Sequence, residues 1–140
     1  RIKKMFIEKD EFDVGIRRLL NYGHTFGHAL ELASNYTIPH GVAVARGMDI
    51  VNYIAVKKEL MGKILYDEIH NIIIEYFYSD RVFGICPKVL IENTKKDKKN
   101  SNGMLNLVFL GELGNLFVKP IQLDSELNAI VSSYIEENFC

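Results

Sequence analysis

The segment Asp13-Val-Gly-Ile-Arg17-Arg-Leu-Leu-Asn21-Tyr-Gly-His24-Thr-Phe-Gly-His28-Ala-Leu-Glu31 decides how this chain folds. Its apolar residues recur with helical spacing, which predicts a helix from about residue 15 to residue 34. At about 100° per residue, the polar side chains of the segment share less than about a quarter of the helix circumference. They are Asp13, Arg17, Asn21, His24, His28 and Glu31, with Asp13 either on this helix or in the turn before it.

The composition of this polar face argues against a merely solvated helix surface, which is the usual meaning of such a pattern. Solvated faces are built mainly from Lys and Glu, whereas this one combines imidazole, amide, guanidinium and carboxylate groups. Those groups suit directed hydrogen bonds or metal ligation. Gly23 and Gly27 lie in the apolar arc, where each lowers helix stability by about 1 kcal/mol. We therefore expect close packing of this helix against another and a functional site on its polar face.

Three histidines are close together in the sequence. His24 and His28 are four residues apart, a spacing at which two imidazoles on one helix can bind a single metal ion. His40 opens the next predicted helix, directly after Pro39. The remaining histidine, His70, has no such neighbour and is interpreted as a surface or half-buried residue without a partner.

The rest of the chain predicts a mainly α fold with one small β-hairpin. Pro39 disfavours helix in the residue before it and so predicts a break over residues 35–39. Further helices are expected at 41–61, 64–78, 87 to about 98, and from Asp124 or Ser125 to 138. Apolar runs at 104–110 and 116–118 predict the two strands. No strand–helix alternation appears in the sequence, so we expect no Rossmann unit.

The bulk properties are those of an ordinary globular domain. The chain has 140 residues, 48% of them hydrophobic and 25% charged, and its formal net charge is -1. This charge argues against a nucleic-acid or membrane-surface binder, and the apolar runs are far too short to cross a bilayer. Cys86 and Cys140 match no metal or redox spacing. We expect a reduced, cytoplasmic protein without a signal peptide.

Three motifs, taken in order, resemble the 3-dehydroquinate synthase family of sugar-phosphate cyclases. Residues 20–31 (LNYGHTFGHALE) match the family's LNxGHTxGHAxE, and residues 40–48 (HGVAVARGM) resemble its HGEAVAxGM. Residues 97–99 (DKK) resemble a third element, which the expected hairpin follows. The first motif is the most specific of the three.

The resemblance implies the mainly α, C-terminal domain of a two-domain enzyme whose N-terminal domain binds NAD. Members of the family hold a divalent metal, usually zinc, with one Glu and two His. His24 and His40 match the two His, and the Glu would lie upstream of Arg1. On this interpretation His24 and His28 do not chelate one ion together, and His28 matches a substrate-contacting position.

The resemblance assigns the remaining polar residues to the substrate. The substrate-binding positions that it implies are Asp13, Arg17, Asn21, His28, Lys98 and Lys99. Asp13 stands where the family often has Glu, and one of the two lysines would contact a substrate carboxylate, with Lys99 preferred. The candidate catalytic residues among them are Arg17, Asn21, His28 and Lys99.

The implied reaction converts a heptulosonate phosphate to 3-dehydroquinate with loss of phosphate, a lyase step of the shikimate pathway. Members of the family oxidise a substrate hydroxyl with NAD, eliminate phosphate, reduce the ketone and close a carbocycle. The chain starts at Arg1 without an initiator Met, so we expect residues 1–140 to be one domain of a longer protein and inactive alone. A homodimer, with neither nucleic acid nor membrane as a partner, is the family-level expectation.

Val42 departs from the family pattern, because HGEAV has Glu at this position. If that Glu orients the metal-binding His, its replacement loosens the site. Val42 is equally compatible with a cyclase for another substrate, resembling 2-deoxy-scyllo-inosose synthase. An alcohol dehydrogenase of the glycerol dehydrogenase type shares the architecture but fits the first motif less well. A non-catalytic helical interaction domain is the remaining alternative, and it leaves the polar face unexplained.

Overall fold

The computed structural model describes residues 16–96 and 103–140. The elements are the 3-10 helix η1 (Ile16–Asn21), α2 (His24–Ala33), α3 (His40–Lys57), α4 (Lys63–Tyr76), the 3-10 helix η2 (Asp80–Val82), α5 (Pro87–Thr94), β1 (Met104–Glu112), β2 (Asn115–Gln122) and α6 (Ser125–Asn138). This order confirms the predicted mainly α fold with one β-hairpin.

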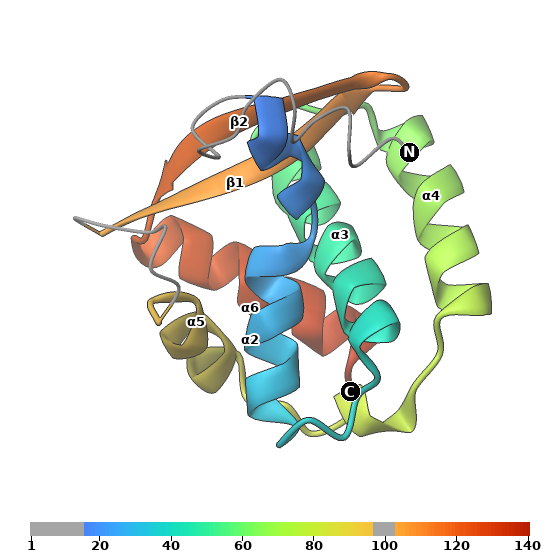
Figure 1. Ribbon diagram of the computed structural model, residues 1–140, viewed down its shortest axis with the longest axis vertical. Helices are drawn as coiled ribbons and strands as arrows, with labels where there is room; N and C mark the ends of the chain where they lie inside the picture. Colours follow the sequence, from blue (N-terminus) through green and yellow to red (C-terminus); the bar gives the residue numbers. More distant parts are fainter. Residues whose placement is uncertain (1–15, 97–102) are drawn as a thin grey trace.

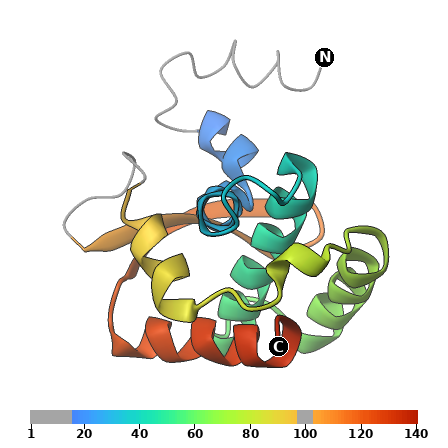
Figure 2. The same ribbon diagram turned by 90° about the horizontal axis from the view of Figure 1, so that it is seen from below.

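The hairpin lies across one end of the helices, and α5 lies toward the other end (Figure 1). Seen from below, α2 is end-on between α3 and α5, with η1 on one side of the molecule and α6 on the other (Figure 2). The core lies where these elements meet. Its fully buried members include Phe26, Leu30, Ile50, Ile54, Leu90, Phe109, Leu127 and Val131.

The predicted continuous helix over residues 15–34 is wrong, because the chain breaks after η1 and restarts as α2. The break is at Gly23, whose φ of 79° is left-handed. A Cβ at this position would lie 2.5 Å from Met48 Cγ and 2.6 Å from the carbonyl oxygen of Val44, both on α3. A close tertiary approach therefore overrides the helical periodicity, and the predicted polar face holds only within α2.

The crossing of α2 and α3 is as close as the glycines predict. A Cβ on Gly27 would lie 3.0 Å from Val44 Cα. From the opposite side, a Cβ on Gly47 would lie 2.1 Å from the oxygen of Gly23 and 2.6 Å from the nitrogen of Gly27. This contact holds α2 directly against α3 and so fixes the histidines that the two helices carry.

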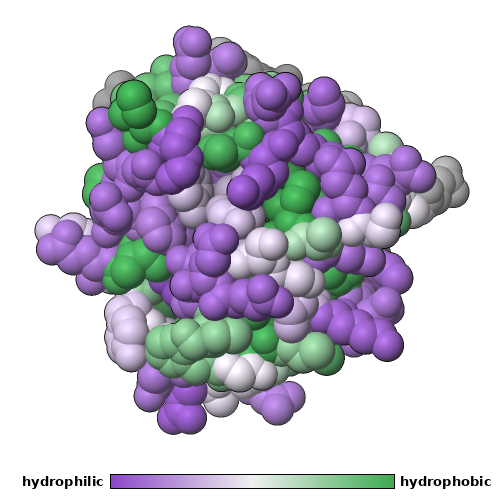
Figure 3. Space-filling view, turned by 180° about the vertical axis from the view of Figure 1, so that it is seen from behind, coloured by the Kyte–Doolittle hydropathy of each residue, from purple (hydrophilic) through white to green (hydrophobic). Residues whose placement is uncertain are grey.

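The other helices form where the sequence predicts them, with shifted ends. α3 ends at Lys57 rather than at residue 61, α4 ends at Tyr76 rather than at residue 78, and α5 ends at Thr94 rather than near residue 98. The sequence patterns do not predict η2. No described helix has both the length and the apolar character needed to span a membrane. The back face is mainly hydrophilic, with separate hydrophobic patches (Figure 3).

The hairpin strands are longer than predicted and pair antiparallel, with Val108 opposite Val118. Gly114, in the turn between them, has a φ of 83°, which glycine adopts without strain. Among the described residues this hairpin is the only sheet. The last helix starts at its predicted cap, because the Asp124 carboxylate accepts a hydrogen bond from the Leu127 backbone nitrogen at 2.9 Å.

Candidate functional site

The structure brings the rings of His24, His28 and His40 together where α2 and α3 begin. The ring centroids are 5.5 Å apart for His24 and His28, 5.8 Å for His24 and His40, and 6.2 Å for His28 and His40. Imidazoles that share a zinc ion with Zn–N bonds of about 2.0–2.1 Å have centroids roughly 5–6 Å apart. Distance alone therefore permits either His28 or His40 as the partner of His24.

Hydrogen bonds distinguish the three rings. His24 Nδ1 lies 3.2 Å from the carbonyl oxygen of Tyr22, and His40 Nδ1 lies 2.8 Å from Glu31 Oε1. These oxygens are acceptors, so each Nδ1 is the donor, and in the neutral ring Nε2 then keeps its lone pair. Among the described residues His28 has ring contacts but no hydrogen-bond partner. Metal-binding imidazoles normally have their second nitrogen fixed in this way, so His24 and His40 have the arrangement typical of ligands.

The three rings differ in their exposure to solvent. His24 is half-buried, whereas His28 and His40 are exposed. Burial is the largest cause that lowers the pKa of His24 below its ordinary value; the hydrogen bond to Tyr22 opposes this effect, and the neighbouring imidazoles add to it. Because a metal binds the neutral imidazole, the environment keeps His24 in its binding form to a lower pH than an exposed histidine.

A cavity of about 90 Å³ adjoins the histidines, between η1, the start of α2 and the hairpin. Its lining residues are Arg18, Asn21, His24, Thr25, His28, Asn106, Val108 and Val118. The structure thus brings Asn21 and His28, which the sequence assigns to the substrate, into one cavity with the predicted metal ligand His24. His40 is beside His24 and does not line this cavity.

Arg18 and Asn106 also line this cavity, although the sequence patterns do not point to either residue. Arg18 falls off the predicted polar face, because that face assumed an α-helix where the chain forms the 3-10 helix η1, with about three residues per turn. Asn106 is a polar residue inside an otherwise apolar strand, where it pairs with Pro120. That polar interruption was the signal that could have pointed to it.

Four predicted site residues are not tested by the structure. The described residues do not include Asp13, Lys98 or Lys99. For Arg17, in η1, the backbone is described but the side chain is not. Their roles stay predictions. Within residues 16–96 and 103–140, no three His, Cys, Asp or Glu side chains form a group that could hold a metal ion.

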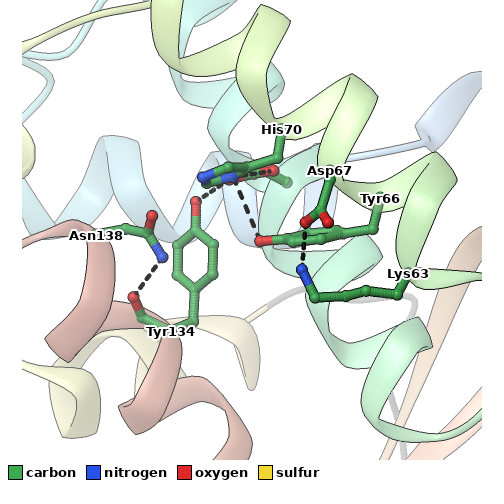
Figure 4. Close-up of polar contacts among 7 residues, drawn as sticks. Lys63, Tyr66, Asp67, His70, Tyr134 and Asn138 are labelled. Carbon is green, nitrogen blue, oxygen red and sulfur yellow. Dashed lines mark hydrogen bonds and ion pairs between the residues drawn. The ribbon is translucent and has the colours of Figure 1, made fainter.

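The interpretation of His70 as a residue without a partner is wrong, although the residue is half-buried as predicted. His70 Nδ1 lies 2.8 Å from Asp49 Oδ2, and the Tyr134 hydroxyl donates to the same oxygen at 2.5 Å. Asp49 is fully buried. Figure 4 shows His70 and Tyr66, from α4, and Tyr134, from α6, pointing toward one another. A histidine and a carboxylate 21 positions apart on different helices leave no local pattern in the sequence.

Comparison with known proteins agrees with the family resemblance of the motifs. The profile of the family described as 3-dehydroquinate synthase C-terminal matches residues 1–100, and the chain therefore belongs to this family. It is 40% identical over 118 residues to 3-dehydroquinate synthase of Clostridium perfringens, covering 84% of this chain and 34% of that protein. It is 35% identical over 136 residues to 3-dehydroquinate synthase of Dehalococcoides mccartyi, covering 97% of this chain and 37% of that protein.

The chain thus spans about a third of the length of the curated relatives that it matches. Among solved structures, its fold is similar to a crystal structure of 2-deoxy-scyllo-inosose synthase complexed with carbaglucose-6-phosphate, NAD+ and Co2+. The TM-score is 0.76 at 20% identity, and the match covers 94% of this chain and 38% of the other. This likeness confirms the fold.

Proposed function

We propose that this chain forms the metal- and substrate-binding domain of a 3-dehydroquinate synthase-like enzyme. Such a carbon–oxygen lyase converts a heptulosonate phosphate to 3-dehydroquinate with loss of phosphate. The observation that carries the proposal is the histidine arrangement: His24 and His40 each have Nδ1 directed at an oxygen, and His24 lines one cavity with Asn21 and His28. Membership of the family and relatives at 35% and 40% identity support it.

His24 and His40 would hold a divalent metal through their Nε2 atoms, and zinc is the metal we expect. Two neutral imidazoles suit zinc and also suit cobalt, the metal in the structural neighbour. A catalytic zinc normally has three protein ligands and an open position, so a further ligand must come from another part of the protein. When bound, the metal polarises a substrate oxygen and lowers the pKa of its hydroxyl.

The substrate would occupy the cavity beside the metal ligands. His28 is exposed there and has no hydrogen-bond partner among the described residues, and the Asn21 amide can both donate and accept. Arg17, Lys98 and Lys99 would supply cations for the phosphate and carboxylate groups of a sugar-acid substrate, and Asp13 would bind a hydroxyl. The hydride step requires NAD, which we assign mainly to a second domain.

The same proposal covers the whole enzyme. Because the relatives are about two and a half times as long as this chain, residues 1–140 would be one domain of a two-domain, cytoplasmic homodimer. No nucleic acid or membrane partner is needed for the reaction. The isolated chain should show no turnover, since neither NAD nor a third metal ligand is assigned to it.

A second candidate function is cyclisation of a different sugar phosphate, as in 2-deoxy-scyllo-inosose synthase. Two observations favour it: the structural similarity, with a TM-score of 0.76, and Val42, which packs partly buried against the core where the related motif has Glu. The pair Lys98 and Lys99 favours the first candidate, because a carboxylate substrate benefits from additional cations.

Phosphate release by the complete polypeptide that contains this chain separates the two candidates. We expect release from a heptulosonate phosphate in the presence of NAD and zinc, and none from glucose 6-phosphate, which the carbaglucose-6-phosphate of the structural neighbour resembles. Preference for the hexose phosphate would establish the second candidate instead. Release from neither would refute both.

Zinc affinity of the same polypeptide tests the ligand assignment. His24→Ala and His40→Ala should weaken zinc binding by more than roughly 100-fold, beyond the effect of removing a group that only supports a ligand. His28→Ala should retain near-normal zinc affinity and lose turnover. If His28→Ala abolishes binding while His40→Ala does not, the pair on α2 is the chelating pair and our assignment is wrong.

A further inference from the structure

Glu31 connects the last part of α2 to the first residue of α3. Its Oε1 lies 2.8 Å from His40 Nδ1, and its side chain is 13% exposed while that of His40 is 61% exposed. A carboxylate that is largely withdrawn from water is therefore directed at one nitrogen of an exposed ring. In the neutral ring this contact places the hydrogen on Nδ1 and leaves Nε2 without one.

Nothing else among the described residues near His40 can fix its ring through Nδ1. Pro39, at the N-cap of α3, makes no side-chain capping bond. The position of Gly41 faces open space, with no atom within 4 Å of a Cβ built there. Val42 packs against the core and has no polar group. Among the described residues Glu31 is thus the one hydrogen-bond partner of the His40 ring, which otherwise contacts only the rings of His24 and His28.

We propose that Glu31 is a positioning residue, which holds His40 in the Nδ1–H form so that Nε2 is available to a divalent metal. The inference rests on the proposed function, since it needs His40 to be a ligand. A carboxylate on the second nitrogen fixes the tautomer and the ring plane and raises the basicity of the ligating nitrogen. Glu31 supplies this support from α2, so Val42 need not supply it from α3.

Two other roles for Glu31 make different predictions. As a simple tie between helices it would contribute little, because an ion pair with one exposed partner is weak, and its loss would leave metal binding unchanged. As a ligand itself, Glu31 would change the set of atoms around the metal when removed. The hydrogen bond directs Glu31 Oε1 at Nδ1, which favours the positioning role over ligation, and zinc affinity separates that role from a simple tie.

The test is zinc affinity, measured by competition with a chromophoric chelator, in the complete polypeptide that contains this chain. Glu31→Ala should weaken zinc binding by about 10–100-fold. Glu31→Gln should weaken it less, because the amide oxygen still accepts from Nδ1–H without the charge. Glu75→Ala, which removes an exposed carboxylate on α4, is the matched control and should bind zinc normally.

Two spectroscopic readouts complete the experiment, and folding of each variant is checked by circular dichroism. The absorption spectrum of the Co2+-saturated protein should be the same in wild type and Glu31→Gln, because the ligand set is unchanged. In metal-free, 15N-histidine-labelled protein at a pH where imidazole is neutral, His40 should be the Nδ1–H tautomer in wild type and in Glu31→Gln. It should move toward the Nε2–H form in Glu31→Ala.

The outcomes separate this inference from the proposed function. Wild-type zinc affinity in Glu31→Ala, or an unchanged His40 tautomer, would overturn the positioning role and leave the enzyme assignment standing. A changed Co2+ spectrum in Glu31→Gln would make Glu31 a ligand and would also overturn it. Normal zinc binding by His40→Ala would instead remove the metal assignment on which both depend.

Discussion

The described residues include two pairs of histidine and carboxylate with the same shortest nitrogen–oxygen distance and opposite surroundings. His40 lies 2.8 Å from Glu31, and His70 lies 2.8 Å from Asp49. The side chains of the first pair are 61% and 13% exposed, and those of the second are 22% and 0% exposed. The contrast teaches that one kind of contact can leave a ring open to solvent or can form part of the core, depending on what surrounds it.

The buried pair is completed by further groups, whereas the exposed pair is left open. Asp49 accepts from both His70 and Tyr134, and the ring of Tyr66 stacks on His70 with centroids 5.2 Å apart. Burial, and after it the charge of Asp49, raises the pKa of Tyr66 and of Tyr134. Both hydroxyls therefore stay protonated, and Tyr134 stays a hydrogen-bond donor to Asp49.

The sharpest test of this contrast is to remove each carboxylate in turn. Asp49→Ala leaves the Tyr134 hydroxyl and His70 without their acceptor inside the protein, so it should reduce the free energy of unfolding by about 3–5 kcal/mol. Glu31→Ala, at a partly exposed pair, should cost less than about 1 kcal/mol. Urea denaturation followed by circular dichroism measures both. Equal losses in the two variants would mean that burial does not distinguish the pairs.

A second test concerns α3, which carries a member of each pair, His40 and Asp49. Gly47→Ala should destabilise the fold by about 3 kcal/mol, because overpacking is costly and the new Cβ would lie 2.1 Å from the backbone oxygen of Gly23, at the N-cap of α2. It should also weaken metal binding, since α2 and α3 would be forced apart. Gly41→Ala is the matched control: it meets no atom within 4 Å and should be neutral or slightly stabilising.

If Gly47→Ala lowers stability but leaves zinc affinity unchanged, the crossing supports the fold without setting the geometry of the histidines. The same two measurements, urea denaturation and chelator competition, decide between these outcomes.

The sequence predicts those features of the fold that depend on local patterning. The hairpin, the Asp124 cap and the α-helices α3 to α6 all follow from periodicity and turn residues within short segments. The break at Gly23 could not be predicted in this way, because it depends on the approach of Met48 and Val44 from another helix. The two glycines signalled close packing but not the left-handed backbone that ends η1.

In the candidate site, too, some features follow from local sequence patterns and others depend on tertiary contacts. His24 and His28 share one helix face, so their proximity follows from spacing alone, and the motif resemblance adds His40. The pairing of His70 with Asp49 could not be predicted, because it joins α4 to α3 through the fold. Asn106 enters the cavity only because the hairpin lies against η1 and the start of α2.

The smallest expected effect comes from Tyr22, which connects the two regions. Its carbonyl oxygen accepts from His24, its hydroxyl donates to Asn52 Oδ1 at 2.5 Å, and the charge of Asp49 contributes to its pKa. Tyr22→Phe should lower stability at neutral pH by about 1 kcal/mol, the net value of one hydrogen bond. It should leave zinc affinity unchanged, because the backbone carbonyl remains.

The pH dependence of this variant gives the finer test. Burial, the largest cause, raises the pKa of Tyr22 from 10.0 to about 12 in the folded protein. Folding therefore favours the protonated phenol, so this contribution to stability is complete below pH 10.0 and is lost as pH rises toward about 12. Urea denaturation at stepped alkaline pH should show a shallower loss of stability in Tyr22→Phe than in wild type. Part of the loss should persist, because Tyr66 and Tyr134 also have raised pKa values.

An identical alkaline profile in the two proteins would mean that Tyr22 is not held protonated by the fold. A fall in the zinc affinity of Tyr22→Phe would mean that the hydroxyl of Tyr22, and not only its carbonyl, positions His24.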